Sequence, residues 1–178
     1  SLLTYWFKNE HNKDFKYYFA QRESVETIIY LYENKKIRNS SQLIEYDSSN
    51  LVTDSMFEED WLRFVIKQAT GSGKTKVLSL LMAWSYFHKS MNEDSDLSKN
   101  ILVICPNTIV LERLKTDLEG LKIFNEDPVI PPNNYGNKTW IFNAKLHIQD
   151  KISSISNSGN IFLTNIQSCL LYTSPSPR

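Results

Sequence analysis

The 178-residue sequence has few cysteines, no long apolar run and no excess of positive charge. Each of these absences excludes a class of protein before any motif is considered. Only two cysteines are present, Cys105 and Cys169, too few for a disulfide framework or a four-ligand zinc site. No apolar run approaches the roughly 20 residues that a membrane-spanning helix needs. Positive and negative side chains balance at 20 each, so there is no global positive charge to attract nucleic acid. We therefore expect an intracellular, cytoplasmic protein without membrane contact, in which any contact with nucleic acid is local.

The apolar content that is present suits about one folded domain. Hydrophobic residues make up 41% of the chain, which excludes a disordered tail. The first residue is Ser1, not methionine, and residues 169–178 read as a translated sequencing adapter, with a natural Ser/Pro-rich tail as the alternative. We therefore expect residues 1–168 to be part of one domain of a longer protein and residues 169–178 to be an artefact.

Short apolar runs alternate with amphipathic segments along the chain. The spacing of apolar residues predicts three helices, over residues 22–33, 77–87 and 111–121. Short apolar runs predict four buried strands, over residues 64–66, 101–105, 140–142 and 161–163. The polar stretch 35–60 reads as a long loop with at most one short helix. This alternation predicts an α/β fold with a largely parallel sheet flanked by helices.

Two of only five glycines stand together in the segment Thr70-Gly71-Ser72-Gly73-Lys74-Thr75. It lies between a predicted strand and a predicted helix, the context that a phosphate-binding loop requires. Glycine permits positive φ, and successive N–H groups at a helix N-terminus bind an anion. Lys74 would then reach the β- and γ-phosphates, and the Thr75 hydroxyl would coordinate Mg²⁺. All six residues are therefore candidates for binding ATP. Lys74 and Thr75 are the candidate catalytic residues, and Thr75 is also the candidate metal ligand.

One position departs from the strict phosphate-loop pattern. Its first glycine would stand at position 68, which is Gln68. The half of the pattern that touches phosphate, from Gly71 to Thr75, is intact. A Ser/Gly turn with a solvated lysine is the alternative, and the register of the lysine and threonine between strand and helix favours the phosphate loop.

Four segments, in family order, resemble superfamily 2 helicases, in particular the restriction-enzyme subunit type. Residues 68–75 resemble motif I, residues 101–107 resemble motif Ia, residues 160–167 resemble the strand that carries a Thr-Asn pair, and residues 18–23 resemble the glutamine-bearing segment ahead of motif I. Together they cover most of residues 15–167. The resemblance implies a P-loop NTPase fold of the RecA-like class, truncated, with ATP and Mg²⁺ as cofactors.

The resemblance also implies roles for residues outside the loop. The Gln21 amide can donate and accept together, which fits the N6/N7 edge of adenine, whereas an exposed polar residue ahead of a helix is the alternative. Pro106-Asn107 and Thr164-Asn165 would lie along a nucleic-acid strand at the carboxyl ends of two β-strands. Simple strand termination and capping of a strand end are the alternatives for these two pairs.

We therefore expect the ATP-binding part of an ATP-dependent helicase or translocase that acts on DNA rather than RNA. Methyltransferase or specificity subunits of a restriction system would be its protein partners. Such motors also need an Asp-Glu-x-His-like segment and an arginine finger from a second motor domain, neither of which occurs up to residue 168, so we expect the chain alone to be inactive. The alternatives are a small-molecule kinase, which the scarcity of arginine after Arg63 disfavours, and an inactive P-loop interaction module, for which Gln68 is the only hint.

Overall fold

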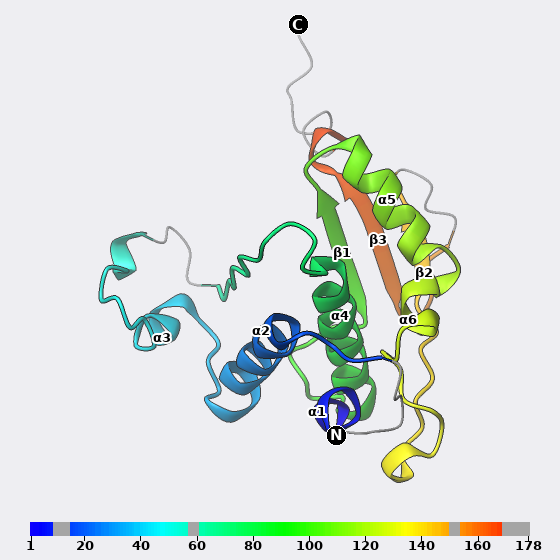
Figure 1. Ribbon diagram of the computed structural model, residues 1–178, viewed down its shortest axis with the longest axis horizontal. Helices are drawn as coiled ribbons and strands as arrows, with labels where there is room; N and C mark the ends of the chain where they lie inside the picture. The colour runs from blue at the N-terminus through cyan, green and yellow to red at the C-terminus, as the bar shows by residue number, and fades with distance from the viewer. Residues whose placement is uncertain (9–14, 57–60, 150–153, 169–178) are drawn as a thin grey trace, which may run out of the picture. The chain divides into compact units, whose positions relative to one another are not determined.

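The chain folds as two units, each described here by itself. The computed structural model describes residues 1–8, 15–56, 61–149 and 154–168 (Figure 1). Residues 17–77 form one unit, called the loop unit below, and residues 1–16 with 78–178 form the other, called the sheet unit. The expected artefact, residues 169–178, lies outside the described residues.

The sheet unit is built on three parallel strands in the order β1-β3-β2. Their bounds are Asn100–Cys105 for β1, Lys145–Ile148 for β2 and Asn160–Asn165 for β3. β1 and β3 pair over their full length, and β2 pairs with the first four residues of β3. Alternate residues of β1 and β3 on one face are buried: Val103, Cys105, Ile161 and Leu163. This confirms the predicted α/β class and the strands predicted at residues 101–105 and 161–163.

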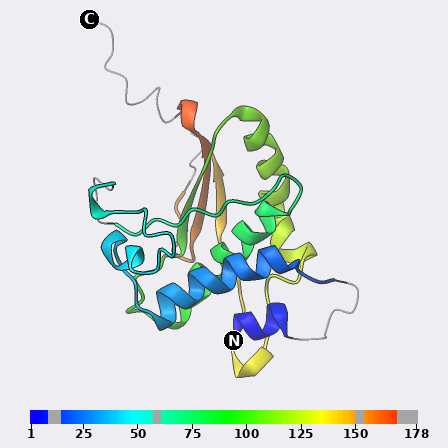
Figure 2. The same ribbon diagram turned by 60° about the vertical axis from the view of Figure 1, so that its left-hand side comes forward.

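Helices cover one side of this sheet. α4 (Lys74–Met91) precedes β1, and α5 (Thr108–Leu118) follows it. In both views α5 runs alongside the strands (Figure 1, Figure 2). Its Leu111 and Leu118 are buried. The remaining helices of this unit are short: α1 (Leu2–Phe7), a 3₁₀ turn (Glu119–Leu121), α6 (Lys122–Glu126) and a second 3₁₀ turn (Tyr135–Asn137). None of the helices among the described residues combines the length and apolar character that crossing a bilayer requires.

The strand predicted at residues 140–142 is wrong, and β2 lies a few residues further along. Trp140 and Phe142 are buried, which explains the strand-like pattern in the sequence. Side chains, however, take the backbone donors that a strand would use: the Trp140 N–H donates to Asn133 Oδ1 (3.2 Å), and the Asn143 N–H donates to the Tyr86 hydroxyl (3.2 Å). Aromatic packing therefore orders this segment in place of a β-ladder.

A buried polar cluster lies where β1 and β3 begin. Asn160 is fully buried, and its Oδ1 lies 2.9 Å from His147 Nε2 and accepts from the Ser156 N–H (2.9 Å). Its Nδ2 donates to Asn100 Oδ1 (2.7 Å) and to the Ser156 carbonyl (2.8 Å). The imidazole also stacks on Phe162, with centroids 4.9 Å apart. Each polar atom of this buried amide is thus satisfied, as burial demands.

The loop unit contains α2 (Phe19–Ile29), a π-helical turn (Tyr30–Asn34), α3 (Ser40–Ile44) and a 3₁₀ turn (Asp54–Met56). α2 and the π-helical turn cover the helix predicted over residues 22–33, and α3 is the one short helix expected between residues 35 and 60. α2 buries its predicted apolar face of Val25, Ile28 and Ile29. From Leu62 to Ala69 the chain runs irregularly into the glycine-containing loop.

The strand predicted at residues 64–66 is therefore wrong within the described residues. Val65, at the centre of that apolar run, is 93% exposed. The loop unit has no regular strand among its described residues, and its one bridge joins Asn39 to Trp61. Without a neighbouring strand, the backbone of residues 64–66 has no ladder to join.

Candidate phosphate-binding site

The glycine-containing loop ends where α4 begins, at Lys74. Gly71 and Gly73 have φ of +82° and +80°, the left-handed region that residues with a Cβ rarely adopt. Among the described residues, no protein acceptor is bound by the backbone N–H groups of Gly71, Gly73, Lys74 and Thr75. Such unpaired donors at the N-terminus of a helix favour a bound anion. The sequence therefore folds locally into a loop whose donors suit phosphate oxygens.

The Lys74 ammonium is held by the loop itself. Its Nζ donates to the carbonyl oxygens of Gln68 (3.2 Å) and Ala69 (2.9 Å). These bonds hold the ammonium on the loop that also carries the free N–H groups, so the loop combines one full positive charge with their partial charges. Thr75 follows in the first turn of α4 and is half-buried, while Thr70 is exposed. An ammonium, four free N–H groups and a threonine hydroxyl together fit a magnesium-bound nucleoside triphosphate.

Gln21 lies on this loop, although it is distant in sequence. The side chain is only 1% exposed, which excludes the alternative of an exposed polar residue. Its Oε1 accepts from the Tyr18 N–H (2.9 Å) and so caps α2, and its Nε2 donates to the Ser72 carbonyl (2.8 Å). A Cβ added to Gly73 would collide with this amide. The structure thus brings Gln21 together with the candidate phosphate-binding residues.

Gln68 is the residue at this site that the sequence reasoning missed as a contributor. Its Nε2 donates to the Ala20 carbonyl (3.0 Å) and to Ser24 Oγ (2.9 Å), both on α2. Its Oε1 accepts from the Ser72 hydroxyl (3.3 Å). The only signal in the sequence was its departure from the glycine of the strict pattern.

The four candidate nucleic-acid residues lie together in the sheet unit. β1 and β3 are paired in register, with Ile104 opposite Thr164 and Cys105 opposite Asn165. Pro106 and Asn107 follow directly after β1, so all four stand at the carboxyl end of two adjacent parallel strands. Ligands of open α/β sheets bind at this edge.

Two of these side chains have local structural partners. Asn107 caps α5, since its Oδ1 accepts from the Val110 N–H (3.0 Å). Asn165 is buried, and its Oδ1 accepts from the Ser168 N–H (2.8 Å). The capping alternatives are therefore present in the structure, and Asn107 and Asn165 keep their amide nitrogens for other contacts.

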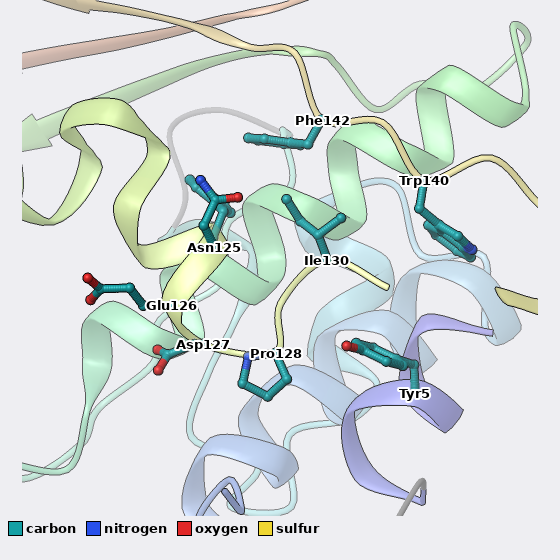
Figure 3. Close-up of a pocket in the computed structure, with 9 residues that line it drawn as sticks. Tyr5, Asn125, Glu126, Asp127, Pro128, Ile130, Trp140 and Phe142 are labelled. Carbon is teal, nitrogen blue, oxygen red and sulfur yellow. The ribbon is translucent and has the colours of Figure 1, made fainter. Parts of the chain in front are cut away.

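A separate hollow of about 430 Å³ lies in the sheet unit and contains none of the predicted site residues. Figure 3 shows its aromatic wall and its acidic rim, in which the carboxylates of Glu126 and Asp127 point away from the rings. Its lining comprises Tyr5, Phe124, Asn125, Glu126, Asp127, Pro128, Ile130, Trp140 and Phe142. Nothing in this arrangement gathers charged groups toward a ligand.

Metal binding by side-chain clusters has no support in the described part of the chain. No group of three histidine, cysteine or acidic residues could hold a metal ion there. Cys105 is buried in β1 as a small core residue, and burial raises the pKa of its thiol.

Comparison with known families gives one match. The family described as type III restriction enzyme, res subunit, matches residues 14–172. This range contains all four segments whose resemblance was noted from the sequence. Comparisons with curated proteins and with solved structures gave no match.

Proposed function

Because the chain belongs to the type III restriction enzyme res subunit family, whose helicase-like members have a RecA-like P-loop fold, we propose that residues 1–168 bind ATP as part of a DNA-translocating motor. Members of this family generally hydrolyse ATP. The observation that carries the proposal is the loop ahead of α4, where four unpaired N–H groups and the Lys74 ammonium gather. A triphosphate is the ligand whose charge and oxygen atoms match these donors.

The roles of the loop residues follow from their chemistry. The N–H groups of Gly71, Gly73, Lys74 and Thr75 would bind phosphate oxygens without first breaking protein hydrogen bonds. Lys74 would exchange loop carbonyls for phosphate oxygens, or bridge the two, as charge develops on the transferred group. The Thr75 hydroxyl would hold Mg²⁺, which when bound neutralises charge on the β- and γ-phosphates.

We expect Gln21→Ala to raise the KM of the intact protein for ATP more than its KM for GTP. The Gln21 amide spends one hydrogen and one lone pair on the protein, which leaves one of each for the N6/N7 edge of adenine once the residues that cover this buried side chain move aside. Loss of such a paired contact costs about 1–3 kcal/mol, which is roughly 5- to 150-fold in affinity. Steady-state kinetics with both nucleotides measures the ratio.

Gln42→Ala is the matched control for this experiment. Gln42 also lies in the loop unit, and its Oε1 accepts from the Arg38 N–H (2.8 Å), so the variant loses a similar bond away from the site. If Gln21→Ala raised the KM for ATP and the KM for GTP equally, the adenine contact would be contradicted. Gln21 would then only cap α2 and contact the loop.

DNA is the polymer that we propose for this motor. In the sheet unit, support comes from the polar edge at Pro106-Asn107 and Thr164-Asn165, whose short uncharged groups suit contacts to phosphate and sugar. The family description names a restriction enzyme, so we also propose methyltransferase or specificity subunits as partners of the intact protein.

Addition of DNA should therefore accelerate ATP turnover by the intact protein. The measurement is phosphate release with single-stranded DNA, double-stranded DNA, RNA and no polymer, each at several salt concentrations. Because phosphate contacts release counterions, the stimulation should weaken as salt rises. If RNA alone accelerated ATP turnover, the proposed polymer would be RNA and not DNA. If no polymer changed the rate of turnover, the result would favour a small-molecule enzyme.

A further inference from the structure

Gln68 contacts both α2 and the lysine of the phosphate-binding loop. Its side-chain amide donates to the Ala20 carbonyl and to Ser24 Oγ, at 3.0 and 2.9 Å. Its backbone carbonyl accepts from Lys74 Nζ at 3.2 Å. One residue thus places the ammonium with its main chain while its side chain is anchored on a helix more than 40 residues earlier in the sequence.

A second amide links the same two elements in the opposite direction. Gln21, on α2, donates to the Ser72 carbonyl at 2.8 Å, whereas Gln68, in the loop, donates to α2. The Ser72 hydroxyl also donates to Gln68 Oε1 at 3.3 Å and to the Ala69 carbonyl at 2.8 Å. Both sides of the loop are therefore attached to α2, and all of these contacts lie within the loop unit.

Glycine, the residue that the strict pattern has at position 68, could make none of the side-chain contacts. The backbone carbonyl that receives Lys74 would remain, but of the two attachments described here the loop would keep only the bond from Gln21 to the Ser72 carbonyl. The loop would also gain backbone freedom, which an ordered phosphate site must lose on binding. The departure from the pattern therefore adds an attachment to α2 and keeps the phosphate-binding half.

We infer that Gln68 is a positioning residue, which fixes the position of the Lys74 ammonium relative to helix α2. Nucleotide binding at the loop is thereby coupled to the conformational order of α2. The inference rests on the proposed function, because it concerns the same nucleotide site. Gln68 does not touch the phosphates in this account and acts through Lys74. Coupling of this kind is reciprocal: ATP orders α2, and an ordered α2 raises the affinity for ATP.

The test compares Gln68→Ala with the wild-type intact protein in nucleotide binding and in hydrogen exchange. Loss of the attachment should weaken the Kd for a non-hydrolysable ATP analogue by about tenfold, the effect of one or two hydrogen bonds. In the wild type the analogue should slow amide exchange across residues 19–29. In Gln68→Ala this protection should fall clearly below that of the wild type, because only the bond from Gln21 to the Ser72 carbonyl still attaches the loop to α2. A purely structural role would lower the Tm and leave the nucleotide-dependent protection unchanged.

Two further variants keep the test independent of folding. Ser24→Ala removes one of the two α2 acceptors of the Gln68 amide, leaves the Ala20 carbonyl, and changes no loop residue, so it should weaken analogue binding by a smaller factor. Since both variants break the same link, the double variant should bind no worse than Gln68→Ala alone. Gln42→Ala again serves as the control, with unchanged binding and unchanged protection of residues 19–29.

The outcomes separate this inference from the proposed function. If the wild-type protein binds no ATP analogue, the proposed nucleotide site itself fails. If the wild type binds but Gln68→Ala, or Gln68→Gly, retains both its affinity and the protection of residues 19–29, the coupling through Gln68 is overturned and the nucleotide site stands. Additive losses in the double variant would likewise overturn a shared link.

Discussion

Replacing Lys74 by alanine is expected to abolish ATP hydrolysis by the intact protein. The side chain supplies the one ammonium that the loop carbonyls of Gln68 and Ala69 hold beside the free N–H groups. Removing a group that stabilises developing charge lowers turnover by at least about a hundredfold. The measurement is phosphate release at saturating ATP, together with the Kd for a non-hydrolysable analogue.

Lys67→Ala is the matched control, because it removes the same charge from the segment that leads into the loop. Lys67 is exposed. We expect its turnover to stay near that of the wild type. Unchanged hydrolysis in Lys74→Ala would contradict the assignment of the loop.

The second large effect is expected for Gly73→Ala, which should lose ATP binding by about a hundredfold. At φ of +80° a residue with a Cβ costs about 1–2 kcal/mol. The new Cβ would also collide with the Gln21 amide, which donates to the Ser72 carbonyl, and loss of that bond adds about 0.5–1.5 kcal/mol. If the loop of the variant relaxes to a less strained conformation, ATP binding must return it to the binding conformation. The free energy of that change then weakens the Kd for ATP.

Gly71→Ala separates strain from collision. Its φ of +82° is nearly the same, but a Cβ there would have no atom within 4 Å. We therefore expect only the strain, a loss of about tenfold in ATP affinity. A Gly71→Ala loss as large as that of Gly73→Ala would show that the contact with Gln21 contributes nothing.

The sequence predicted those parts of the fold that depend on local pattern. The apolar spacing of α4 and α5 and the apolar runs of β1 and β3 depend only on which of their own residues are buried, so those predictions are confirmed. The runs at residues 64–66 and 140–142 carry the same pattern, but a strand also needs a partner backbone. Val65 has no partner strand among the described residues, and side chains of Asn133 and Tyr86 take the donors around Trp140.

The sequence predicted those site residues that belong to a short motif. It did not predict contacts between side chains that are far apart in the sequence. The spacing of the glycines with Lys74 and Thr75 identified the loop. That Gln21 is buried against Ser72, and that Gln68 reaches back to Ser24, depends on contacts across 51 and 44 residues. No local pattern encodes such contacts, so Gln68 was visible only as an exception to a motif.

The buried amide of Asn160 has a consequence for how the sheet can be assembled. If β3 slipped by one residue, its side chains would exchange faces, and the amide would leave His147 and Asn100 while an isoleucine took its place. Each buried polar group stranded in this way costs about 1–3 kcal/mol, whereas the apolar residues of β3 would tolerate several registers. Asn160 therefore favours one register of β3 against its two neighbouring strands.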